Sequence, residues 1–253
     1  MELTTLLIVC PLVFLAGFVD AIAGGGGLIS LPGYLLAGLP PINAVATNKL
    51  SSSIGTAAAT WRLWRGGYIN FALAIPAALL AIAGSIIGSQ LALITPESMF
   101  TLLLVIVLPI VALFTLRTNS FRDETNESIS FRKRCVIVAI FAFFIGGYDG
   151  FYGPGAGTFM LIAFTVCAQL SVKEASGQVK AANLASNVAA LVMFALNGVV
   201  WFELGLIAAI FSTLGSYLGA ARIMNDGTKI VRPIIALVLT LLFVKIVLEA
   251  TIL

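Results

Sequence analysis

The chain has 253 residues, of which 60% are hydrophobic and only 10% carry a charged side chain. Water-soluble domains contain about 25% charged residues, so this composition excludes a soluble protein and predicts an all-α integral membrane protein in a lipid bilayer. The formal net charge of +3 indicates little by itself, because the positions of the basic residues matter more than their sum, and we expect no nucleic-acid partner.

The first half of the chain contains apolar segments of two lengths. Leu3–Ile22 has the roughly 20 apolar residues that a membrane-spanning helix needs, and it ends at a run of glycines. Leu28–Gly38 would span only about 16 Å as a helix, too short for a hydrocarbon core of about 30 Å, which predicts a half-helix or one arm of a re-entrant hairpin. Three longer segments follow, at Asn43–Trp64 with Asn43 as the expected helix cap, at Phe71–Ile94 and at Glu97–Leu116.

A hydrophilic stretch at residues 118–134 divides the chain almost in half. We expect it to be a cytoplasmic linker between membrane repeats at residues 1–117 and 135–253. After it the order of segments recurs, with Lys180 in the position of Lys49, and the segments are Cys135–Tyr152, Thr158–Gln169, Val172–Leu196, Phe202–Ile223 and Ile230–Glu249. The sequence therefore predicts two repeats of about five membrane segments, each with a glycine-rich broken or re-entrant helix.

The basic residues predict how these repeats lie in the membrane, because cytoplasmic connections carry an excess of lysine and arginine. Connections at 95–97 and 197–201 carry no basic residue and should face away from the cytoplasm. The basic connections are those with Arg62 and Arg65, the central linker, and the one with Arg222, Lys229 and Arg232. Corresponding connections thus lie on opposite sides, which predicts inverted repeats with both termini outside the cytoplasm.

Each half contains a glycine-rich break inside apolar sequence. Glycine costs a mid-helix position about 1 kcal/mol, so the helices should break there. Close helix packing is one explanation of such glycines, but their number exceeds what packing needs. Backbone amides at the start of a following half-helix would attract an anion, and the candidate ligand-facing glycines are Gly24, Gly25, Gly26, Gly27, Gly153, Gly155 and Gly157.

Two lysines lie one to two turns inside apolar segments. Lys49 or Lys180 alone could extend its ammonium group to the membrane interface. Their recurrence in both halves favours a site that attracts an anion, because buried charge is costly and usually functional. Asn183 and Asn187 share a helix face with Lys180, and the further hydrogen-bonding residues near the two lysines are Thr47, Asn48, Ser51, Ser52 and Gln178.

An aspartate precedes each glycine-rich break, at Asp20 and Asp149. These carboxylates could neutralise the two lysines, accept coupling protons, or end their helices near water. The sequence alone leaves all three roles open. The functional role that we predict for the pair is coupling or charge balance.

No catalytic pattern is present in the sequence. It has no histidine, no GxSxG motif, no metal-ligand cluster and no Gly-Lys-Ser/Thr after its glycine run, so a nucleotide-binding loop is not indicated. We therefore expect no enzyme activity, no metal site and no cofactor.

The chain resembles the sulfite exporter TauE/SafE family, also called the four-toluene sulfonate uptake permease family. The likeness covers essentially the whole chain, is greatest to the YfcA-like subgroup, and rests on Asp20–Pro32, Gly38–Pro41, Thr47–Lys49, Gly153–Gly157 and Lys180–Asn187. The resemblance implies transport of sulfite, sulfonates and other sulfur-containing organic anions across bacterial inner membranes, usually outward.

Together these observations predict a multi-pass secondary transporter of the bacterial inner membrane. Its expected substrate is a small sulfur-containing or organic anion, held between the two breaks and moved by alternating access. A homodimer is compatible with the sequence. The first rival is a passive anion channel, and the second, a membrane-embedded enzyme or assembly factor, is disfavoured because the sequence shows no nucleophile, metal cluster or soluble module.

Overall fold

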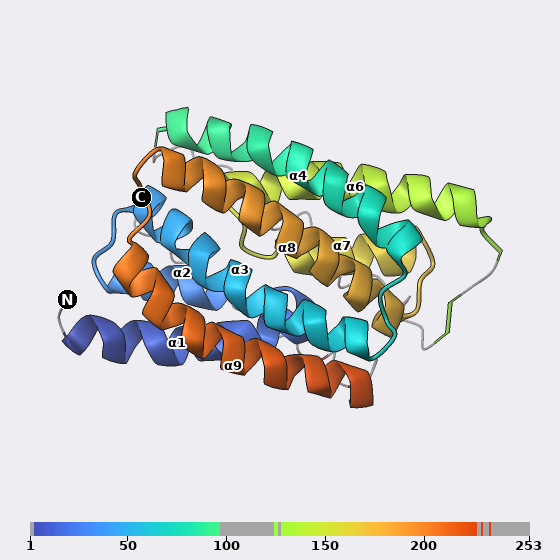
Figure 1. Ribbon diagram of the computed structural model, residues 1–253, viewed down its shortest axis with the longest axis horizontal. Helices are drawn as coiled ribbons and strands as arrows, with labels where there is room; N and C mark the ends of the chain where they lie inside the picture. The colour runs from blue at the N-terminus through green and yellow to red at the C-terminus, as the bar shows by residue number, and fades with distance from the viewer. Residues whose placement is uncertain (1–2, 97–123, 126–127, 227–228, 230–232, 234–253) are drawn as a thin grey trace.

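The computed structural model describes residues 3–96, 124–125, 128–226, 229 and 233 of the chain (Figure 1). Every regular element in those residues is a helix. The helices are α1 (Leu3–Ala23), α2 (Gly27–Leu36), α3 (Pro41–Arg65), α4 (Phe71–Ile94), α6 (Phe131–Phe151), α7 (Ala156–Val166), α8 (Val172–Leu196) and α9 (Phe202–Asp226). Five of them, α1, α4, α6, α8 and α9, are long and apolar enough to cross a membrane. For the described residues, the prediction of an all-α protein with membrane-spanning candidate helices is confirmed.

Most helix ends lie where the apolar pattern places them. The bounds of α4 and α8 match the prediction, and the short α2 and α7 follow the two glycine-rich breaks. α6 begins at Phe131, four residues before the predicted Cys135, because the intervening Arg and Lys residues are good helix formers. The predicted helices Glu97–Leu116 and Ile230–Glu249 lie outside the described residues, apart from Pro233.

The start of α3 differs from the prediction. The helix begins at Pro41, where the missing proline N–H costs no helical hydrogen bond. Asn43 therefore lies inside the first turn and is not the helix cap. Its side-chain amide instead donates a hydrogen bond of 2.8 Å to the carbonyl oxygen of Val199, in the loop before α9.

Helices from the two halves of the chain alternate in space. α3 and α8 contact each other at the centre, with α4 and α6 on one side of them and α1 and α9 on the other (Figure 1). α9 packs on α1 and α3, and α4 packs correspondingly on α6 and α8. Each half thus places its fourth helix against the first and third helices of the other half.

The two outer helix pairs pack through glycines at corresponding positions. A Cβ atom built on Gly84 of α4 would lie 2.0 Å from the Phe143 carbonyl oxygen of α6. A Cβ atom on Gly215 of α9 would lie 2.0 Å from the Phe14 carbonyl oxygen of α1. Glycine therefore lets these backbones approach more closely than any larger residue would allow. The next turn of each helix repeats the contact, at Gly88 and Gly219.

Candidate functional site

Two buried ion pairs connect the halves of the chain. Lys49 Nζ on α3 lies 2.8 Å from Asp149 Oδ1 on α6. Lys180 Nζ on α8 lies 2.6 Å from Asp20 Oδ2 on α1. Each lysine side chain is only 2% exposed, so both ammonium groups point into the protein and not toward the membrane surface.

The Lys49 pair is enclosed by further polar side chains. Lys49 Nζ also donates to Asn187 Oδ1 at 2.8 Å, and the Asn187 amide donates to Asn183 Oδ1 at 2.5 Å. The other oxygen of Asp149 accepts a 2.5 Å hydrogen bond from the Ser186 hydroxyl. With Asp149 only 5% exposed, this network satisfies both charges without solvent.

The Lys180 pair is more open. Asp20 is 19% exposed, against the 5% of Asp149. Its second carboxylate oxygen accepts a long hydrogen bond of 3.4 Å from the backbone N–H of Gly26, immediately before α2. The Asp20 carboxylate is therefore bound as anions commonly are, between a cation and the N-terminus of a helix.

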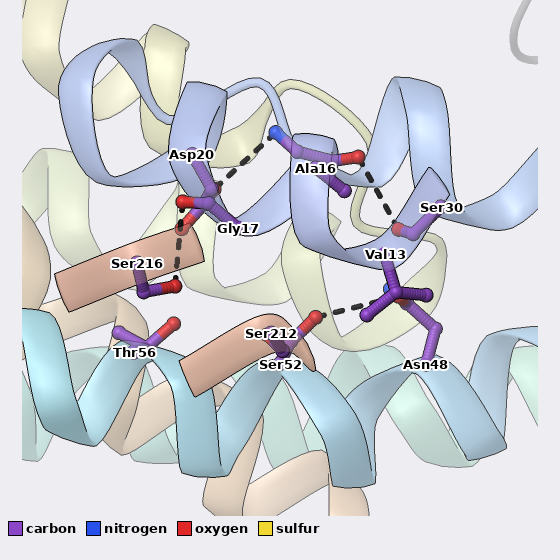
Figure 2. Close-up of a pocket in the computed structure, with 11 residues that line it drawn as sticks. Val13, Ala16, Gly17, Asp20, Ser30, Asn48, Ser52, Thr56, Ser212 and Ser216 are labelled. Carbon is purple, nitrogen blue, oxygen red and sulfur yellow. Dashed lines mark hydrogen bonds between the residues drawn. The ribbon is translucent and has the colours of Figure 1, made fainter. Parts of the chain in front are cut away.

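A small polar cavity adjoins Asp20, between α1, α2, α3 and α9 (Figure 2). It offers about 10 Å³ to the centre of a water molecule, close to the minimum that holds one water. Figure 2 shows Asp20 on one side of the cavity and the side chains of α3 and α9 on the other. The polar residues that line it are Asp20, Ser30, Asn48, Ser52, Thr56, Ser212 and Ser216.

The glycine-rich breaks of the two halves touch each other. The Gly24 carbonyl accepts a hydrogen bond from the Thr158 N–H at 3.2 Å, and the Thr158 hydroxyl donates to the Ala23 carbonyl at 2.7 Å. A Cβ atom on Gly157 would lie 2.6 Å from Gly24 Cα and 3.0 Å from the Asn183 amide nitrogen. The backbones of the two breaks are thus in direct contact, next to Asn183.

Only part of each glycine-rich break needs the left-handed conformation that glycine favours. Gly24 has φ +78° and Gly153 has φ +101°. Gly26, in contrast, is right-handed with φ −56°. A side chain at Gly26 would be excluded by space, because its Cβ atom would lie 2.5 Å from the Ala16 carbonyl oxygen. Gly155, with φ +82°, caps the start of α7.

The contact between the breaks predicts a large difference between two alanine substitutions. Gly24→Ala and Gly38→Ala both place alanine at a positive φ, which costs about 1–2 kcal/mol. Gly38 has no atom within 4 Å of an added Cβ, whereas the Cβ of Gly24→Ala would lie 2.1 Å from the Gly157 backbone. Overpacking should cost Gly24→Ala a further ~1–3 kcal/mol. Unfolding midpoints in detergent test this, and equal losses would show that the contact is not tight.

Three polar residues that the sequence predicted near the lysines bind other partners in the structure. The Thr47 hydroxyl accepts a hydrogen bond from the Trp201 N–H, Ser51 pairs with the Tyr34 hydroxyl, and the Gln178 amide donates to the Tyr68 carbonyl. Asn48 lines the cavity and accepts from the Ser52 hydroxyl at 3.3 Å.

Ser30, Thr56, Ser212 and Ser216 line the cavity and were missed as site residues. Small hydroxyl side chains are common in membrane helices as packing residues, so their composition did not single them out. The available signal was the spacing of Ser212 and Ser216, which places both hydroxyls on one face of an otherwise apolar helix.

Comparisons with known proteins agree on one family. A model of the family described as "Sulfite exporter TauE/SafE" matches residues 9–246. A Sinorhizobium protein named "Probable membrane transporter protein ORF9" is 35% identical over 94% of this chain and 90% of its own length. "Probable membrane transporter protein YfcA" of Escherichia coli K12 is 30% identical over 93% of this chain and 87% of its own. No solved structure matches the chain.

Proposed function

Because the chain belongs to the sulfite exporter TauE/SafE family, a family of membrane transporters, we propose that it exports small sulfur-containing or organic anions across the bacterial inner membrane. Sulfite and sulfonates are the expected substrate class. The family description supports the export direction. The observation that supports an anionic substrate is the pair of buried lysines, since a cation inside the membrane is costly and is usually functional.

The anion site of this proposal centres on Lys180, with Lys49 as a second positive charge on α3, the helix that contacts α8. Lys180 has Asp20 beside it, and Asp20 in turn faces the polar cavity. The N–H of Gly26 and the amide of Asn48 supply hydrogen-bond donors at the same place. Because the cavity has room for about one water molecule, the described conformation is closed, and a sulfonate enters only when the surrounding helices separate.

Alternating access between two inverted repeats is the proposed mechanism. The exchange of corresponding helices between the halves supports it, as do the matching glycine contacts of α4 with α6 and of α9 with α1. The two ion pairs follow the same exchange, because each joins a helix of one half to a helix of the other. Rocking one repeat against the other would open the site to each side of the membrane in turn.

Counterflow in proteoliposomes tests the transport proposal. Vesicles loaded with unlabelled sulfite should accumulate labelled sulfite transiently, and the initial rate should saturate with concentration. A matched preparation of Lys180→Met should lose this uptake. Single-channel current without counterflow would instead identify a passive anion channel, and the absence of both with every sulfur-containing anion would reject anion transport.

The inverted arrangement predicts the location of two reporter fusions. A reporter fused after Leu253 should lie outside the cytoplasm, and one in the linker near Thr125 should lie inside it, because basic connections stay cytoplasmic. Alkaline phosphatase and green fluorescent protein fusions at both places measure this. If both places report the same compartment, the arrangement of five plus five segments is wrong.

A further inference from the structure

The charges at the described site leave no net positive charge for an anion. Lys49 and Lys180 contribute two ammonium groups, and Asp149 and Asp20 contribute two carboxylates, each within hydrogen-bond distance of its partner. An anion added to this arrangement would introduce an unbalanced negative charge into a region that is poorly solvated, which is expensive. Binding therefore requires that one carboxylate lose its charge.

The two carboxylates differ in their ability to do so. Asp149 is 5% exposed and accepts hydrogen bonds from Lys49 and the Ser186 hydroxyl. Asp20 is 19% exposed and faces a cavity large enough for about one water molecule. Asp20 is therefore accessible to a water molecule, whereas Asp149 is enclosed by Lys49 and Ser186.

We propose that anion binding depends on protonation of Asp20: a proton and a small anion bind together, the proton on the Asp20 carboxylate and the anion in its place on Lys180 Nζ and the Gly26 N–H. This inference rests on the proposed function. The proton comes from bulk water and forms an O–H bond on Asp20, the Asp20–Lys180 ion pair breaks, and the ammonium keeps its three protons. When a monovalent anion is bound, the net charge of the site is zero.

The groups around Asp20 can form hydrogen bonds with both its ionised and its protonated carboxyl group. Among the described residues, Lys180 from α8 is the charged group that faces it, and Gly26, just before α2, contributes its uncharged N–H. The cavity residues from α3 and α9 are hydroxyls and one amide, which can accept a hydrogen bond from the protonated acid; they are Asn48, Ser52, Thr56, Ser212 and Ser216. None of them titrates near neutral pH.

The pH dependence of sulfonate binding tests this coupling. Methanesulfonate is a suitable probe, because its charge is constant from about pH 5 to about pH 8, where histidine is the only side chain that ordinarily titrates and the chain has none. Binding that requires protonated Asp20 must weaken as the pH rises, by at most about tenfold in Kd per pH unit. We expect this weakening for the parent protein.

Substitutions assign the dependence to one carboxylate. Asp20→Asn mimics the protonated acid, so its Kd for methanesulfonate should not vary with pH and should be at least about tenfold lower than that of the parent at about pH 8. Asp149→Asn leaves the Asp20 carboxylate on Lys180 Nζ, so a proton is still needed to free the site. It and the exposed control Glu203→Gln should therefore retain the pH dependence of the parent. Loss of the dependence in Asp149→Asn alone would transfer the role to the other half and overturn the proposal.

A measurement on the parent protein alone covers the case in which Asp20→Asn does not fold. Titration calorimetry in two buffers of different ionisation enthalpy gives the number of protons taken up with each methanesulfonate, and we expect about one at a pH where Asp20 is ionised in the free protein. Binding with no proton uptake at any pH would overturn the coupling and leave the proposed function standing. No binding of methanesulfonate or sulfite at any pH would overturn both.

Discussion

Lys49→Met is expected to lower the free energy of unfolding by about 3–5 kcal/mol, because removal of one partner leaves a buried charge uncompensated. Asp149 is only 5% exposed, and Lys49 is its cationic partner. Methionine keeps the apolar part of the lysine side chain but also deprives Asn187 Oδ1 of its 2.8 Å donor. Unfolding of the purified protein by urea in detergent, followed by tryptophan fluorescence, measures the loss.

A second substitution should recover much of this stability. In Lys49→Met with Asp149→Asn the buried charge is gone, and an asparagine oxygen can still accept the hydrogen bond from Ser186. The double-mutant cycle should therefore show an interaction energy of at least about 0.5 kcal/mol between the two positions, as for coupled neighbours. Strictly additive losses would mean that Lys49 and Asp149 do not stabilise each other in the folded protein.

Lys180→Met should cost less stability than Lys49→Met. Its partner Asp20 is 19% exposed and borders a polar cavity, so the carboxylate left behind can be hydrated or protonated. Comparison of the two methionine variants by the same unfolding measurement separates the enclosed ion pair from the open one. A larger loss for Lys180→Met would reverse this assignment.

The sequence predicts the helices well because membrane segments are defined by local composition. Phe71–Ile94 is bounded by Asn70, whose side chain caps the helix, and by Pro96, and both signals are readable without the fold. The short α2 and α7 are equally local, since each begins just after a glycine-rich break that a helix cannot continue through.

The partners across the protein are not local and could not be read from the chain. The repeat matches Lys49 with Lys180 and Asp20 with Asp149, but it does not say which aspartate each lysine meets. The structure pairs Lys49 with Asp149 and Lys180 with Asp20. This choice follows from the exchange of helices between the halves, which depends on long-range packing.

The glycine-rich breaks show the same limit. Their composition predicts an interruption, and the structure has one in each half. The composition could not predict that the backbone of Gly24 contacts that of Gly157. Some of the glycines are therefore needed for contact between the two breaks. Asn43 is another example, because its side-chain amide donates to the distant carbonyl of Val199, a partner that no local pattern indicates.

Lys180→Met is expected to weaken binding of a sulfonate anion by about 30-fold to several-thousand-fold. Loss of a desolvated charge contact costs roughly 2–5 kcal/mol, and each ~1.4 kcal/mol is tenfold in Kd. Lys180→Arg should not restore affinity, since a planar guanidinium needs a different pocket from an ammonium that is 2% exposed beside Asp20. Isothermal titration with methanesulfonate measures both variants.

Lys173 provides the matched control on the same helix. It lies about two turns before Lys180, with its Nζ 5.9 Å from the centre of the Tyr68 ring and away from both ion pairs, so Lys173→Met removes the same charge without touching the site. Its Kd should stay within about twofold of the parent, because the charge it removes lies near the helix end and is screened. If Lys180→Met and Lys180→Arg also bind within that range, Lys180 does not contact the anion, and the substrate must be bound elsewhere in the protein.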